Sequence, residues 1–194
     1  MKRIQCDRMV VDAPFFLPKL QKYVSLPELQ NWDFRSQDES KALALYRRFM
    51  DLLMEKWHVN ESALYRLLDQ LSGEQAKEME EILTIAKSEV KNRNWGEIHR
   101  VSFSHLSKNE EWIFSPDESG IGDNHSIDPG TAKWNPDRKV YEQFSGASMR
   151  MIIEMDESPR IFLSLPGVNR DYTEVKNPGI WKDWRNCQYS EIKF

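Results

Sequence analysis

The spacing of apolar residues changes near the middle of the chain. Up to residue 93 they recur at intervals of three and four, which is the period of a helix with one buried face. From residue 94 onward, short runs alternate apolar and polar residues, and this period of two predicts β-strands. We therefore predict an α+β chain, helical over residues 1–93 and built of antiparallel strands over residues 94–194, forming a single domain.

Two long helices carry the clearest signals in the first part, and shorter ones are expected over residues 12–24 and 61–71. The apolar stripes lie at Ala42, Tyr46, Phe49, Leu53 and Trp57 (residues 40–57) and at Ala76, Met79, Leu83, Ala86 and Val90 (residues 74–90). Capping boxes of the S-x-x-E/Q type precede both: Ser36 with Glu39, and Ser72 with Gln75.

The second part predicts one isolated strand and one β-hairpin. A strand over residues 97–105 would place His99, Val101, Phe103 and His105 on one face. Residues 147–155 and 160–165 read as a hairpin, and we expect its stripe of Met149, Met151, Ile153 and Met155 to lie in the core. Residues 107–144 and the aromatic tail after residue 167 are expected to be irregular, and the length of the first segment favours a functional or packed role.

Composition excludes several classes of function. A net charge of −4 with a pI near 5.7 provides no basic field for nucleic acid. No apolar run approaches the roughly 20 residues of a membrane span, and scattered charges at the N-terminus do not fit a signal peptide. Cys6 and Cys187 could form a disulfide if the chain ends are adjacent, but two thiols define no framework.

Two kinds of site can be drawn from the residues. A metal site could use His99, His105, Asp123, His125 and Asp128, but no recognised ligand spacing connects them, so packed or hydrogen-bonded side chains are favoured. For nucleophilic catalysis, Ser102 and Ser104 point to the other face of the strand from the histidines, and no G-x-S-x-G elbow is present. Gly120 and Gly122 do not form a phosphate loop. The residues alone assign no catalytic, cofactor or metal-binding side chain.

Taken in order, five segments resemble the penicillin acylase (penicillin amidase) family. They are collinear over residues 1–167: "MKRIQCD", "LQNWDFRSQDESKALALYRRF", "NWGEIHRVSFSHL", "GIGDNHSIDPG" and "GASMRMIIEMDESPRIFLSLPG". The resemblance implies a layered αββα N-terminal-nucleophile (Ntn) hydrolase fold and cleavage of acyl–amine amide bonds. The substrates of such enzymes include penicillins, acyl-homoserine lactones and related amides.

The resemblance places residues 1–194 in the C-terminal portion of the family's large (β) chain, with Met1 matching an internal position. The family's serine nucleophile, oxyanion donors and calcium ligands all match positions upstream, so no catalytic residue and no cofactor is transferred, and the chain alone should be inactive. Its partner would be the remainder of the acylase chain. An exposed sheet edge and apolar face would also favour self-association. The family further suggests an exported protein, with neither a nucleic-acid partner nor a membrane span.

Residue by residue, the resemblance gives structural roles. His99 and Val101 match a strand of the layered sheet and should pack and form hydrogen bonds, while Asp123 and Ser126 match a turn-forming loop. The family strand S-x-R matches Ser148, Met149 and Arg150, and the turn after the hairpin matches Pro166-Gly167. Beyond this turn only a glycine and one tryptophan, Trp181 or Trp184, follow the family pattern. The alternative function is a non-enzymatic α+β interaction module or an orphaned remnant.

Overall fold

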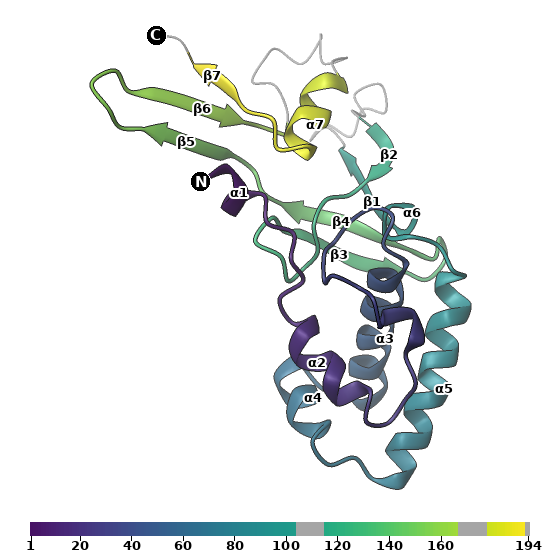
Figure 1. Cartoon of the computed structure of the whole chain (residues 1–194). Coiled ribbons are helices and arrows are strands. Elements are labelled where there is room, and N and C mark those ends of the chain that lie inside the picture. Colours follow the sequence, from purple (N-terminus) through teal and green to yellow (C-terminus); the bar gives the residue numbers. More distant parts are fainter. Residues whose placement is uncertain (104–114, 167–177, 193–194) are drawn as a thin grey trace. The chain divides into compact units, whose positions relative to one another are not determined.

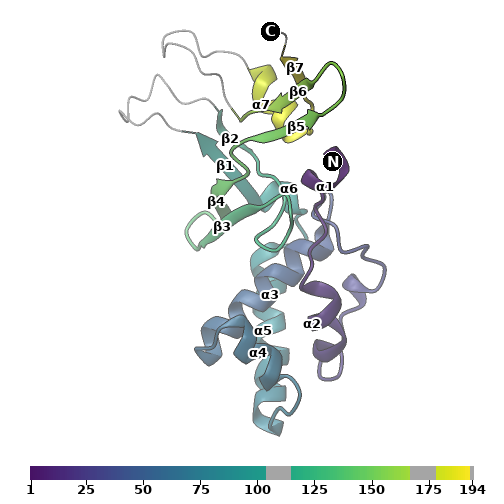
Figure 2. The ribbon, with the colours of Figure 1, turned by 90° about the vertical axis from the view of Figure 1, so that its left-hand side faces the viewer.

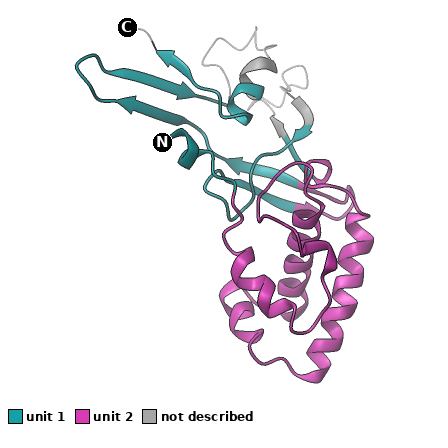
Figure 3. Ribbon diagram, viewed as in Figure 1, with its two compact units in different colours: residues 1–8, 99–133, 142–194 teal, residues 9–98, 134–141 magenta. Residues whose placement is uncertain are grey.

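Helices and strands separate into two units in the computed structural model, which describes residues 1–103, 115–166 and 178–192. The helical unit comprises residues 9–98 and 134–141, and the strand unit comprises residues 1–8, 99–133 and 142–194 (Figure 3). Both chain ends belong to the strand unit. The predicted α+β class is confirmed, while the single domain stays a prediction.

The helical unit contains the four predicted helices and, in addition, one 3-10 turn and one single helical turn that the sequence patterns did not predict. They are α2 (Ala13–Leu20), η1 (Pro27–Leu29), α3 (Lys41–Trp57), α4 (Glu61–Leu67), α5 (Gly73–Val90) and the single turn α6 (Trp95–Ile98). Helices α3 and α5 lie side by side (Figures 1 and 2). Their facing stripes form much of the core, which includes Tyr46, Phe49, Leu53, Met79, Leu83 and Val90. None of the described helices combines the length and the apolar character needed to cross a bilayer.

One of the two predicted capping boxes is confirmed. Ser72 Oγ accepts a hydrogen bond from the backbone N–H of Gln75 at 3.2 Å, and Gln75 Oε1 accepts one from Ser72 N at 3.0 Å. The box at Ser36 and Glu39 is wrong. Ser40 caps α3 instead, because it directly precedes the first helical residue and its Oγ lies 3.1 Å from Leu43 N.

The end of the β3–β4 hairpin, residues 134–141, belongs to the helical unit. The Trp134 and Tyr141 rings meet at 5.1 Å, and the Arg48 guanidinium lies 4.6 Å from the Trp134 ring. The Tyr141 hydroxyl donates a 2.5 Å hydrogen bond to Asp51. Burial raises the pKa of Tyr141 well above its usual value, and the negative charge of Asp51 adds to this effect, so the phenol remains a neutral donor.

The strand unit contains strands of two sheets. In the first, β1 (His99–Phe103), β2 (Ser115–Ser119), β3 (Gly130–Asn135) and β4 (Val140–Gly146) follow the order β2-β1-β4-β3. In the second, β5 (Arg150–Glu154), β6 (Arg160–Ser164) and β7 (Ser190–Ile192) follow the chain order, with antiparallel pairing throughout. Two helices, α1 (Lys2–Gln5) and α7 (Pro178–Arg185), complete the unit (Figure 1). The predicted hairpin, β5–β6, is confirmed.

Several strand-region predictions need correction. The strand expected from residue 97 begins only at His99, because Trp95 and Gly96 form the turn α6, held by bonds from Trp95 N to Ser40 O and from Gly96 N to Asp38 O. Residues 107–144 are not irregular throughout, since they contain β2, β3 and part of β4. The turn between β3 and β4, "PDRK", is flanked by β-forming residues, a hairpin signal that the high polar content hid. The tail contains α7 and β7.

The methionine stripe of β5 is exposed, so its prediction as core is wrong. The exposed fractions are 53% for Met149, 41% for Met151, 44% for Ile153 and 83% for Met155. The intervening residue Arg150, polar and therefore expected outside, is only 2% exposed. The alternation predicts two faces, but the side that carries Arg150 is the inner one. The ion pair with Asp128 stabilises the buried arginine.

Replacing Ser40 with alanine should lower the free energy of unfolding by about 0.5–2 kcal/mol, since Leu43 N loses the side-chain acceptor that caps α3. The matched control is Glu39→Ala, which removes the residue of the rejected capping box and should change stability by less than about 0.5 kcal/mol. Urea denaturation followed by far-UV circular dichroism measures both. A larger loss for Glu39→Ala than for Ser40→Ala would show that the helix start has been misassigned.

Candidate functional site

The imidazole of His99 is a buried packing group at the start of β1. Its Nε2 lies 3.1 Å from the carbonyl oxygen of Gly130, and its backbone oxygen accepts a 2.7 Å bond from Gly120 N. The two glycines leave room for the ring: an added Cβ at Gly120 would lie 2.6 Å from His99 Nδ1, and one at Gly130 would lie 2.8 Å from Cε1. These contacts agree with the packing and hydrogen-bonding role that the family resemblance implies for His99.

The loop of residues 122–130 is organised by its own polar side chains. Gly122 has a φ of +58°, a conformation that favours glycine, and Asp123 Oδ1 accepts a bond from His125 N at 2.9 Å. Ser126 Oγ accepts from Asp123 N and donates within the loop. Asp123 and Ser126 therefore build a turn, as the match to the family loop predicts.

Three of the candidate metal ligands have other partners. His99 is bonded to Gly130, Asp123 holds the loop, and Asp128 is paired with two arginines. Among the described residues, no three of the candidates His99, Asp123, His125 and Asp128 lie close enough together to coordinate one ion. His105 and Ser104 fall outside the described residues, and Ser102 is part of β1.

A buried carboxylate joins distant parts of the strand unit. The side chain of Asp128 is fully buried, and its Oδ2 accepts a 3.0 Å bond from Arg8 Nε. Its Oδ1 is paired with Nη2 of Arg150, whose side chain is also buried. The backbone N–H of Asp128 donates to Asp7 O at 2.8 Å. One carboxylate thus connects the N-terminal segment, the 122–130 loop and β5.

Both arginines also reach the C-terminal end of α7. Arg150 Nη1 donates to Trp184 O at 2.9 Å, and Arg8 Nη2 donates to Arg185 O. The Arg150 guanidinium lies 4.7 Å from the Trp184 ring, where a cation–π interaction adds to the contact. Helix carbonyls at this end lack intrahelical partners and carry partial negative charge. Two guanidinium groups and the single carboxylate of Asp128 leave one positive charge, and these helix carbonyls complement it.

A disulfide between Cys6 and Cys187 closes the same region. The Cα atoms are 6.2 Å apart, although 181 residues separate the cysteines in sequence. The Tyr189 hydroxyl donates to Gln5 Oε1 at 2.7 Å, and burial raises the pKa of this phenol, which keeps the proton on the donor. The sequence left the pairing of the two cysteines open, because it could not show that the chain ends meet.

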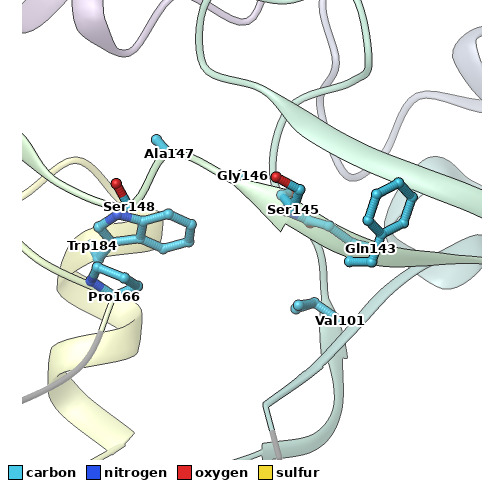
Figure 4. Close-up of a pocket in the computed structure, with 9 residues that line it drawn as sticks. Val101, Gln143, Ser145, Gly146, Ala147, Ser148, Pro166 and Trp184 are labelled. Atoms are coloured by element: carbon cyan, nitrogen blue, oxygen red, sulfur yellow. Dashed lines mark hydrogen bonds between the residues drawn. The ribbon is translucent and has the colours of Figure 1, made fainter.

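A pocket of about 300 Å³ opens beside this network within the strand unit. Figure 4 shows Trp184, Pro166 and Ser148 at one end of the pocket and Val101 and Gln143 at the other. Val101, Ile121 and Trp184 form a small core cluster, and two of them, Val101 and Trp184, also line the pocket. Gln143 is fixed, because its Oε1 accepts from Ile121 N and its Nε2 donates to Ser145 O.

The pocket offers binding surface without acid–base groups. Its lining is mostly apolar, and its polar side chains are those of Gln143, Ser145 and Ser148. None of the lining residues has a side chain that titrates near neutral pH, so neither serine has a general base beside it in this pocket. Such a pocket can hold an apolar group by contact and hydrogen bonding. The sequence suggested Ser148, Pro166 and Trp184 only through the family resemblance, and did not suggest Val101 and Gln143 as pocket residues.

Replacing Asp128 with asparagine should destabilise the strand unit by about 3–5 kcal/mol, because it removes the carboxylate that neutralises Arg8 and the buried Arg150. The control is Glu154→Gln, which breaks an exposed ion pair with Arg160 and should change the free energy of unfolding by at most about 1 kcal/mol. Chemical denaturation followed by circular dichroism and tryptophan fluorescence measures both. Equal, small effects would contradict a structural role for Asp128.

The whole chain, residues 1–194, matches the family model described as Penicillin amidase. Comparison with curated proteins gives no match. The match confirms the resemblance drawn from the five collinear segments, and it includes the divergent tail after Pro166. The α+β architecture, with antiparallel β5, β6 and β7 following the helices, is consistent with the fold of that family. The chain therefore belongs to the penicillin amidase family of acylase-like amidohydrolases.

Proposed function

We propose that residues 1–194 act as the C-terminal portion of the large chain of a penicillin acylase-like amidohydrolase. Such an enzyme cleaves the amide bond between an acyl group and an amine, in penicillins, acyl-homoserine lactones or related compounds. The observation that carries the proposal is that the family match extends over residues 1–194 while the candidate site contains binding and structural groups without an activated nucleophile.

The chemistry of the family explains why this portion would be structural. An N-terminal-nucleophile enzyme needs a hydroxyl, a free α-amine and oxyanion donors held within hydrogen-bonding distance. Here both thiols are joined in a disulfide, and the imidazole of His99 is bonded to Gly130. Ser145 lies near the end of β4 and Ser148 on the connection to β5, with no general base among the residues lining their pocket. The reacting groups and the calcium ligands would come from the remainder of the acylase chain.

The disulfide supports a location outside the reducing cytosol. Disulfides between cysteines distant in sequence persist in oxidising compartments, such as the periplasm or the extracellular space. Cys6 and Cys187 join the two ends of the strand unit, so reduction would remove the covalent link between the N-terminal segment and the residues after α7. We therefore infer that the chain works as part of an exported enzyme.

A non-enzymatic interaction module is the second candidate. It is favoured by the exposed methionine stripe of β5, which is unusual for a strand with no binding role. The two candidates differ in one consequence. Only an acylase portion should complete the active site of an enzyme that lacks this region.

The purified 194-residue chain should not hydrolyse phenylacetyl, aliphatic-acyl or homoserine-lactone amides above the uncatalysed rate. Mixing it with a penicillin amidase truncated before the region that matches residues 1–194 should restore turnover, because this portion would complete the enzyme's fold. Amine release, followed by chromatography, measures both reactions.

The controls are Ser145→Ala and Ser148→Ala, which should leave the restored activity within about twofold, since neither serine is the nucleophile in this account. Hydrolysis by the chain alone, abolished by either substitution, would contradict the proposed role. No turnover in the mixture would favour the interaction module instead.

A further inference from the structure

One face of the β5–β6–β7 sheet is largely apolar, and Ser190, which pairs with Leu163, is a polar but uncharged member of it. Directly paired residues of antiparallel strands point to the same face. The register pairs Met151 with Leu163 and Ile153 with Ile161, and Ile161 with Ile192 on the third strand. Together with the flanking methionines of β5, this side forms what we call the methionine face: Met149, Met151, Ile153, Met155, Ile161, Leu163 and Ile192.

The methionine face is open to solvent and carries no charge. Its side chains in and directly beside β5 are 41–83% exposed, and Ile192 is 36% exposed. The charged residues of the two paired strands alternate with them and lie on the opposite face, where Glu154 pairs with Arg160 and Arg150 is buried against Asp128. A nucleic acid or a charged peptide would therefore find no complementary group on the methionine face.

The area of the face fits a modest protein interface. The exposed fractions of Met149, Met151, Ile153, Met155 and Ile192 amount to about two and a half fully exposed side chains. This is on the order of 400–500 Å², near the upper end for the largest apolar patch of a monomer. Two such faces in contact would bury roughly 1,000 Å² in total, which corresponds to a weak but specific complex.

We propose that the methionine face pairs with the same face of a second copy of the chain, giving a two-fold symmetric dimer. An isologous contact brings each patch against itself, and an uncharged patch meets no like-charge repulsion in that arrangement. Unbranched methionine side chains adapt to one another across such a contact. In such a dimer each copy covers the methionine face of the other, so one contact removes the apolar surface of both copies from water. The proposal does not depend on the acylase function.

Sedimentation equilibrium and light scattering of the purified chain test this interface. The chain should show a monomer–dimer equilibrium in the micromolar range, and Ile153→Glu should raise the dissociation constant at least tenfold by placing a charge in the apolar contact. The matched control is Ile85→Glu on α5, where the side chain is 47% exposed, close to the 44% of Ile153. This control should leave the dissociation constant unchanged.

A milder variant, Met151→Gln, keeps the test valid if Ile153→Glu fails to fold by circular dichroism, and it too should weaken the dimer. A chain that stays monomeric at all concentrations would overturn the proposal. So would a dimer that both methionine-face variants leave intact, or one that Ile85→Glu weakens equally. Binding of this face only to the truncated acylase, with no self-association, would assign it to that partner and would also overturn the proposal.

Discussion

The strand unit depends on one buried carboxylate. Asp128 joins Arg8 of the N-terminal segment to Arg150 of β5, and both arginines continue to the last carbonyls of α7. A carboxylate with no exposure must be paired, and the guanidinium of Arg150, whose side chain is 2% exposed, needs acceptors for most of its donors. The network therefore leaves little freedom in how these segments fit together, and the disulfide between Cys6 and Cys187 joins the same segments covalently.

The Asp128 network also holds residues of the pocket in place. Trp184 is held by its carbonyl and by the stacked guanidinium of Arg150, while Gln143 is fixed by two hydrogen bonds of its own. The polar groups of the pocket can bind and orient a ligand. None of the lining residues has a titratable side chain that could transfer a proton near neutral pH. The pocket thus has the properties of a binding or structural region.

Local sequence patterns predicted the helices well, because each buried face is long and each signal is repeated. The capping box at Ser72 and the stripe from Met79 to Val90 agree with the structure. Ser36 was a weaker choice than Ser40, since two serines four residues apart both suit a helix start and only the first helical residue decides between them. The β3–β4 hairpin was missed because polar residues interrupt the apolar ones in its strands and the surrounding segment is rich in Gly, Pro, Asp and Asn.

The candidate site could not be read from local patterns. Alternation in "SMRMIIEM" predicts two faces but cannot tell which is buried, and only the tertiary contact with Asp128 makes the arginine side the inner one. Likewise, the disulfide and the Arg8–Asp128 pair join residues more than 100 positions apart. The family resemblance selected Asp123, Ser148 and Arg150 in this region. The residues alone offered only an unassigned metal site that included Asp123 and Asp128, and an open pairing of Cys6 with Cys187.

Native-state hydrogen exchange tests the central role of the Asp128 network most directly. In the native chain, the amides of Asp128, Gly120 and β5–β6 should exchange with one common opening free energy, because the network makes the strand unit open as a whole. In Asp128→Asn these amides should lose protection together, while those of α5 in the helical unit keep theirs. Fast, independent exchange of the 120–130 amides in the native chain, or unchanged protection in Asp128→Asn, would contradict the account.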